Sequence, residues 1–287
     1  MKHQAVREPV ATYSADDGLY TPEVGTWGLQ KYKLVALYNE LFSTGMKKQW
    51  DRRVYIDLFA GAGKARLKDT GKVVHGSPLI ALGVPNPFDR YIFCENDPEA
   101  MNALQQRVQK DYPQADVRYV QGDCNQVIDS IIAQIPTYSK QVRVLSFCFV
   151  DPFSLNIHFD TIRKLATYIM DFLILLMLMD PMRNESRYME TNSDRIDRFL
   201  GLSDWRQRWN KAKASNVSFR KFLATQFANQ MISLGYLEDS LKTMVEVRSD
   251  DKNLPLYYLS FFSKHELGYK FWQDVRKYAT NQLSLDI

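Results

Sequence analysis

Seven short segments rich in apolar, β-branched and aromatic residues recur along the chain, and they predict seven β-strands. The first five are separated by stretches of helical periodicity and cover residues 54–59, 91–94, 117–120, 142–150 and 172–179. Nearly continuous apolar strands that alternate with helices indicate a parallel sheet with both faces covered. The last two segments, 243–248 and 256–262, flank a polar turn and predict a hairpin that adds an antiparallel edge.

Capping residues place helices between these strands. Thr26 is a candidate N-cap for a helix that extends to about Phe42, and Ser77 followed by Pro78 begins another helix. Further helices are expected over residues 98–110, 125–134 and 159–168. The first 25 residues are interpreted as an irregular arm, and the polar stretch 64–76 as an inserted loop.

The pattern changes after the fifth strand, because only helical signals appear from Arg187 to Gly235. Five parallel strands followed by a hairpin is the layout of class I methyltransferases. The expected fold is therefore α/β and Rossmann-like, with a central, mostly parallel sheet, an antiparallel C-terminal hairpin and a helical insertion. The expected parts are an N-terminal arm and helix (1–50), a Rossmann-like core (51–182), the insertion (183–240), and the hairpin with a final helix (241–287).

The composition fits a globular chain with a sizeable core, because 45% of the 287 residues are apolar. The formal net charge of +4 permits a nucleic-acid partner without arguing for one. Cys94, Cys124 and Cys148 form no C-x-x-C pair, so we expect buried thiols and neither a zinc site nor a disulfide framework.

The longest apolar run, residues 172–179, falls far short of the ~20 residues that a membrane-spanning helix needs. Residues 1–8 are polar and contain no apolar signal segment. These two observations predict a cytoplasmic protein without a membrane partner.

The first strand ends in the sequence Asp57-Leu58-Phe59-Ala60-Gly61-Ala62-Gly63. Glycine lets the backbone turn tightly and lets a ligand approach closely. Arg66 stands where a dinucleotide site would have its third glycine, which argues against NAD. An acid four residues before the first glycine is instead typical of S-adenosylmethionine sites. The candidate cofactor-binding residues here are Asp57, Phe59, Gly61 and Gly63; the alternative is a tight turn that holds no ligand.

Acidic residues also follow the second and third strands. Glu95 can accept hydrogen bonds from two ribose hydroxyls, or it can cap the next helix, a role that we expect of Asp97 instead. Asp123 can accept from an adenine amino group, with Cys124 against the ring, or it can cap the following helix. Because ligands bind at the carboxyl ends of parallel strands, these acids are expected to share one site.

The fourth strand closes with Val150-Asp151-Pro152-Phe153. Amino-group methyltransferases carry Asp/Asn-Pro-Pro-aromatic or a close variant at this place, whereas this chain has Ser154 instead of a second proline. A carboxylate there can hold the N–H groups of the acceptor, and an aromatic ring can stack on a planar substrate. Asp151, Pro152 and Phe153 are therefore the candidate catalytic residues; the alternative is a strand-end turn.

A basic and aromatic stretch from Trp205 to Phe222 contains no acidic residue. Basic side chains bind phosphate, and aromatic rings stack on bases. Candidate contacts to nucleic acid, in this stretch and just after the glycine motif, are Lys64, Arg66, Trp205, Arg206, Arg208, Trp209, Lys211 and Lys213. The alternative is that Trp205 and Trp209, four residues apart, share a helix face that packs on the domain. No spacing of histidines suits a metal.

Motifs that occur together over nearly the whole chain suggest a family. They are Trp27 with Lys31 and Lys33, the segments 55–63 and 76–82, Glu95, and the segments 150–153 and 256–265. With these motifs the chain resembles the three-Cys-motif partner proteins of bacteria and phages. The resemblance implies a methyltransferase-like fold and a partner protein that carries the three cysteines. Asp151 to Phe153 is also similar to the motif of tRNA guanine N2-methyltransferases.

The leading hypothesis is a methyltransferase that uses S-adenosylmethionine and acts on an amino nitrogen of a nucleobase in nucleic acid. The alternative is a non-catalytic, methyltransferase-like partner of a radical-type enzyme in a phage or mobile-element context. A third hypothesis is a nuclease whose clustered acids hold Mg²⁺.

Overall fold

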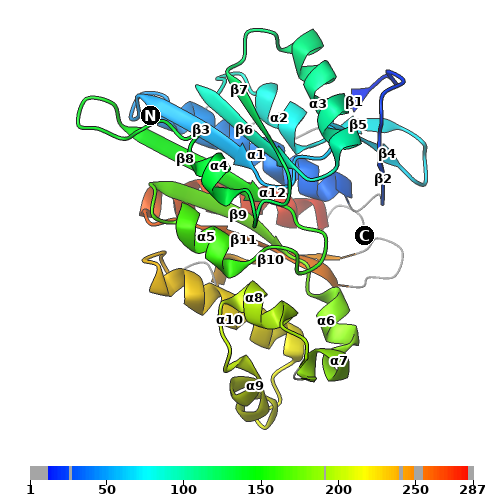
Figure 1. Ribbon diagram of the computed structural model, residues 1–287, viewed down its shortest axis with the longest axis vertical. Coiled ribbons are helices and arrows are strands. Elements are labelled where there is room, and N and C mark those ends of the chain that lie inside the picture. The colour runs from blue at the N-terminus through cyan, green and yellow to red at the C-terminus, as the bar shows by residue number, and fades with distance from the viewer. Residues whose placement is uncertain (1–11, 26–27, 191, 239–241, 249–254, 284–287) are drawn as a thin grey trace.

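The computed structural model describes residues 12–25, 28–190, 192–238, 242–248 and 255–283. Its centre is a seven-stranded sheet with the strand order β10-β11-β9-β8-β3-β6-β7 (Figure 1). These strands are β3 (Arg52–Asp57), β6 (Arg90–Glu95), β7 (Val117–Gln121), β8 (Val144–Val150), β9 (Met170–Leu176), β10 (Val245–Arg248) and β11 (Pro255–Phe262). Strand β11 is antiparallel to both neighbours, and the pairs from β9 to β7 are parallel. The sheet and its C-terminal hairpin confirm the prediction from the apolar pattern.

Side chains alternate between the two faces of the sheet, and each face has its own apolar core. Tyr55 and Phe147 belong to the core on one face, together with residues of α1 (Gly28–Met46), α2 (Ser77–Leu82), α3 (Pro98–Asp111) and α12 (Glu266–Leu283). Ile56 and Cys148 belong to the other, with residues of α4 (Ile128–Ile132) and α5 (Phe159–Leu165). Burial on both sides explains why β8 and β9 are apolar and buried along their length.

A group of helices follows β9 and gathers on one side of the sheet (Figure 1). They are α6 (Met179–Arg183), α7 (Glu185–Met189), α8 (Arg195–Leu200), α9 (Trp205–Lys213) and α10 (Phe219–Ser233). Helix α8 contacts α5, and α10 contacts α6, α8 and α9. Phe199 and Phe227 stack in this segment with ring centroids 5.0 Å apart, and both belong to the same apolar core as Ile56.

A second, four-stranded sheet corrects two of the predictions. It has the order β1-β5-β4-β2 and consists of β1 (Tyr13–Ser14), β2 (Glu23–Val24), β4 (Lys64–Leu67) and β5 (Val73–His75). The stretch 64–76 is therefore a hairpin rather than a loop, and part of the N-terminal arm pairs with it. Strands of two to four residues leave almost no periodic signal in a sequence. Ala65, Leu67 and Val74 form a small core there with Tyr32 of α1.

Two helix starts differ from the expectation or cannot be compared with it. Helix α4 begins at Ile128 rather than at Asn125, because the carbonyl of Asp123 accepts from the N–H groups of Gln126 and Val127 and forms a turn first. Thr26 and Trp27 lie outside the described residues.

Candidate functional site

The chain makes a tight turn after β3, at the centre of the large sheet. Gly61 and Gly63 have positive φ angles of 61° and 80°, which L side chains rarely adopt. The N–H of Gly61 donates to Oε2 of Glu95 at 2.7 Å. The N–H of Gly76 donates to the carbonyl of Gly63 at 2.7 Å, and a Cβ on Gly76 would lie only 3.3 Å from that oxygen. The turn is therefore fixed by β6 on one side and by the start of α2 on the other.

Asp57 contacts this turn from the interior of the fold, and its side chain has no exposed surface. Its Oδ1 accepts from the N–H of Phe59 at 3.2 Å, and its Oδ2 accepts from the hydroxyl of Tyr55 at 3.3 Å. Burial raises the pKa of Asp57 to about 7, and hydrogen bonds from Ser77 and Phe59 offset part of that effect. Because this carboxylate is enclosed, we interpret Asp57 as a residue that positions the glycine turn.

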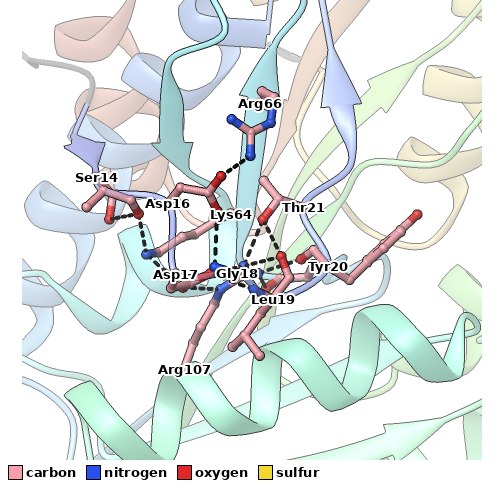
Figure 2. Close-up of polar contacts among 12 residues, drawn as sticks. Ser14, Asp16, Asp17, Gly18, Leu19, Tyr20, Thr21, Lys64, Arg66 and Arg107 are labelled. Atoms are coloured by element: carbon pink, nitrogen blue, oxygen red, sulfur yellow. Dashed lines mark hydrogen bonds and ion pairs between the residues drawn. The ribbon is translucent and has the colours of Figure 1, made fainter.

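The N-terminal segment 16–21 is tied to the glycine turn through Arg107 of α3 (Figure 2). The buried guanidinium of Arg107 donates to the two carboxylate oxygens of Asp17, at 2.9 and 2.7 Å, and to the carbonyl of Ala62 at 2.6 Å. Arg107 holds the pKa of Asp17 well below its usual range. Arg107 thus joins the N-terminal segment to the glycine turn, although Asp17 and Arg107 are 90 residues apart in the sequence.

Lys64 and Arg66 belong to the same network and do not extend an open basic surface as expected. Nζ of Lys64 lies 2.9 Å from Oδ2 of Asp17, and the Lys64 side chain is almost fully enclosed. Nη2 of Arg66 lies 2.5 Å from Oδ2 of Asp16. Lys64 is therefore not accessible to a phosphate, whereas Arg66 forms a partly exposed pair with Asp16.

A pocket of about 390 Å³ lies at the carboxyl edge of the large sheet. This volume falls within the range of small-molecule sites, about 300–1,000 Å³. The lining residues follow β3, β6, β7 and β8 or lie on α8, and they are Leu58, Phe59, Glu95, Asn96, Gly122, Asp123, Cys124, Asn125, Phe153, Leu155, Asn156, His158, Arg195 and Arg198. The pocket thus brings together four predicted site residues: Phe59, Glu95, Asp123 and Phe153.

Glu95 and Asp123 line this pocket from neighbouring strands. Oε1 of Glu95 accepts from the N–H of Asp97 at 2.8 Å, and Oδ1 of Asp123 accepts from the N–H of Asn125 at 2.9 Å. Each carboxylate oxygen can accept more than one hydrogen bond, so both acids keep capacity for a ligand. Asp97 caps α3 through the N–H of Glu99, as predicted, whereas Asp123 does not cap α4.

Asp151 follows β8 and forms an ion pair with Lys31 of α1. Nζ of Lys31 lies 2.5 Å from Oδ2 of Asp151, and the two side chains are 6% and 20% exposed. Burial alone would lower the pKa of Lys31, but the charge of Asp151 raises it above its ordinary value, so Lys31 carries its positive charge. Asp151 does not belong to the pocket lining. Pro152 is buried beside it, and Phe153 is 84% exposed.

Trp205 and Trp209 are buried, with exposed fractions of 0% and 2%, which overturns their expected role in stacking on bases. Nε1 of Trp205 donates to Asp197 at 3.0 Å, and Nε1 of Trp209 donates to Glu185 at 2.9 Å. Both rings also pack on Phe219. The four-residue spacing marks a packed helix face, which was the alternative interpretation.

The basic residues of α9 are mostly engaged within the fold. Arg206 donates to Asp197 at 3.0 Å and to backbone carbonyls, among them that of Glu190 at 2.9 Å. Arg208 pairs with Asp204, Lys213 pairs with Glu185, and Lys211 is exposed. None of these four basic side chains lines the pocket. The basic residues predicted on α9 therefore do not line the pocket.

Six polar residues of the pocket were not predicted: Asn96, Asn125, Asn156, His158, Arg195 and Arg198. Asn125 joins two loops, because its Oδ1 accepts from the N–H of His158 at 2.9 Å and its Nδ2 donates to the carbonyl of Asn156 at 2.8 Å. Arg195 and Arg198 stand three residues apart on α8, a spacing that places them on one side of the helix. Their place at the pocket depends on the packing of α8 on α5 and leaves no local signal.

The cysteines, the possible metal ligands and the hydropathy of the helices bear on other kinds of site. Cys94, Cys124 and Cys148 are buried free thiols, as predicted. In the described ranges, no group of three or more His, Cys, Asp or Glu side chains could hold a metal ion. Within the same ranges no helix has the length and hydropathy to cross a membrane.

Comparisons by sequence found no matching family model and no matching curated protein. Solved structures do match. Protein LPL1258 from Legionella pneumophila str. Philadelphia 1 is 10% identical with a TM-score of 0.50, over 86% of this chain and 90% of that chain. A putative O-methyltransferase from Klebsiella pneumoniae is 11% identical with a TM-score of 0.46, over 86% and 84%. TYW2 of M. jannaschii, solved in complex with AdoMet, is 10% identical with a TM-score of 0.40, over 89% and 87%.

The strand order and the single reversed strand β11 define the fold class. The chain has a Rossmann-like α/β fold, with a mostly parallel seven-stranded sheet between helices. Its pocket lies at the carboxyl edge, where ligands bind in open α/β sheets.

Proposed function

We propose that this chain binds S-adenosylmethionine in the pocket at the carboxyl edge and transfers its methyl group to an amino nitrogen of a nucleobase. One observation carries the proposal. Phe59, Glu95, Asp123 and Phe153, which follow four different strands, line a single pocket large enough for a nucleoside ligand.

The residues around the pocket fit this cofactor. A Cβ on Gly61 would meet no atom within 4 Å, so the glycine turn is open on the side where the methionine moiety would lie. Glu95 has acceptor capacity for the ribose hydroxyls. Asp123 has the same capacity for the adenine amino group, and Cys124 lines the pocket beside it. Gly63 has a structural part, because a Cβ there would lie 2.8 Å from the side chain of Leu104.

S-adenosylmethionine supplies an electrophilic methyl group on a sulfonium. The contribution of the protein is to hold the acceptor nitrogen in line with that group. Asp151 would accept an N–H of the acceptor, because its carboxylate keeps lone pairs beyond the one engaged by Lys31. Lys31 pairs with Asp151 and fixes its orientation. Phe153 would offer a ring face to the base. As the N–C bond forms, the nitrogen loses a proton, which passes to Asp151 or to water.

Methyl transfer from tritium-labelled S-adenosylmethionine to tRNA, rRNA, single-stranded DNA and proteins tests this function. We expect label in a nucleic acid, and Asp151→Asn to lower transfer by about 100-fold, the order of a lost positioned acid–base group. Asp160→Asn, an exposed acid of α5, is the control and should match the unaltered protein. Saturable cofactor binding without transfer to any acceptor would favour the non-catalytic partner instead.

A further inference from the structure

Helix α8 brings two arginines to the wall of the pocket. Arg195 and Arg198 both line it, together with Asn156 and His158 from the loop before α5. Residues three apart lie on the same side of a helix, so the two guanidinium groups point into one region. Figure 1 shows α8 beside α5, at the junction between the sheet and the helices that follow β9.

The rest of α8 is held by packing, which gives the two arginines a fixed base. Ile196, Phe199 and Leu200 are buried. Asp197 accepts from Nε1 of Trp205 and from Nη1 of Arg206, both at 3.0 Å. Trp205 and Arg206 of α9 therefore hold α8 in place through Asp197.

The two arginines have only weak partners within the chain. Nη2 of Arg195 lies 3.4 Å from Oδ1 of Asn156, at the long limit of a hydrogen bond. Arg198 pairs with Asp194 at 2.6 Å one turn away, and both side chains are at least half exposed. An exposed pair of this kind contributes little to stability, so a phosphate can displace it. Guanidinium groups bind phosphate with two parallel hydrogen bonds, which favours replacement of the aspartate partner by a phosphate.

Phe153 completes the arrangement. Its ring is 84% exposed although it lines the same pocket as the arginines. Aromatic side chains bind unpaired bases by stacking, and a planar partner would cover this exposed apolar surface. A ring for a base and a pair of arginines for phosphate, beside one pocket, match the parts of an unpaired nucleotide.

We propose that Arg195 and Arg198 bind the backbone phosphates of a single-stranded nucleic acid whose unpaired base stacks on Phe153. This inference rests on the proposed function, because it names the acceptor of that site. It also assigns recognition to α8 rather than to the basic face of α9.

Fluorescence anisotropy with labelled 20-nucleotide RNA and DNA single strands of mixed sequence tests the inference. The variant Arg195→Gln/Arg198→Gln should bind at least tenfold more weakly than the unaltered protein. The slope of log K against log salt should become shallower by about 1.4, since each lost phosphate contact on a single strand removes about 0.7. Arg208→Gln is the matched control, because Arg208 is equally exposed, pairs with an acid one turn away and does not line the pocket.

Calorimetric titration with S-adenosylmethionine separates the failure of this inference from the failure of the proposed function. Unchanged cofactor affinity in the double variant, with weakened strand binding, supports the assignment of α8 to the acceptor. Equal strand binding in the double variant and the unaltered protein overturns it, as does an equal loss in Arg208→Gln. A loss of cofactor affinity in the double variant also overturns it, because the arginines would then hold the cofactor. If the protein binds single strands through the two arginines but does not bind the cofactor, the proposed function is wrong and the phosphate site remains supported.

Discussion

Nζ of Lys31 lies 2.5 Å from Oδ2 of Asp151, and this pair connects the first helix of the fold to the proposed acceptor site. Lys31 is almost wholly enclosed, so removing its charge would leave a carboxylate in a poorly solvated place. The pair therefore links the stability of the fold to the geometry of the site.

The Lys31→Met substitution is expected to destabilise the protein by about 3 kcal/mol, because it leaves Asp151 without its ammonium partner. Lys31→Met/Asp151→Asn should recover part of that loss, since the uncompensated charge is gone. Urea unfolding of the two single variants and the double variant measures the coupling. Single effects that simply add would contradict the role given to this pair.

Arg107 is expected to matter for both stability and the glycine turn. Arg107→Met removes the donors to Asp17 and to the carbonyl of Ala62, and should cost about 3 kcal/mol in the free energy of unfolding. It should also weaken cofactor binding, because the carbonyl of Ala62 in the glycine turn loses the guanidinium that holds it in place. Arg118→Met, at an exposed arginine of β7, is the control for unfolding and titration. Equal stability of the two variants would argue against the network in Figure 2 as a support of the turn.

The buried carboxyl groups of Asp57 and Asp171 should each reduce stability as the pH rises from about 4 to about 7. Burial raises the pKa of Asp57, and that of Asp171 in the buried strand β9, to about 7, whereas an unfolded aspartate titrates near 4. Between these values the folded chain binds more protons than the unfolded chain, so each group lowers stability by up to ~1.4 kcal/mol per pH unit. Asp17 has a lowered pKa and acts in the opposite direction, but its contribution is lost only below about pH 4.

Asp171→Asn isolates one of these two contributions. The free energy of unfolding of this variant should change less between pH 5 and pH 6.5 than that of the unaltered protein. Asp160→Asn, at an exposed acid, should keep the full slope. If Asp171→Asn has the same slope as the unaltered protein, the pKa of Asp171 is not raised in the folded state.

The large sheet could be predicted because burial on both faces leaves long apolar runs, as in β8 and β9. The acids at the strand ends could be placed for a related reason, since parallel strands bring their carboxyl ends to one edge. Glu95 and Asp123 do line one pocket. Asp57 was placed correctly along the chain, but its complete burial depends on Tyr55 and Ser77 and has no local signal.

The small sheet and the arginine wall could not be predicted, for different physical reasons. Strands such as β1 and β2, of two residues each, have no periodicity to detect. Arg195 and Arg198 reach the pocket because α8 packs on α5, a contact between distant segments. Trp205 and Trp209 looked accessible because basic residues surround them in sequence, yet their four-residue spacing places both on the buried face.

Calorimetric titration of the full chain with S-adenosylmethionine and S-adenosylhomocysteine tests the central claim most directly. The structure predicts saturable binding at one site, and at least tenfold weaker binding in Asp123→Asn and in Glu95→Ala. Asp97→Asn, which keeps the cap of α3 and lies outside the pocket lining, should bind like the unaltered protein. Absence of saturable binding, or equal affinity in all four proteins, would contradict the assignment of this pocket to the cofactor.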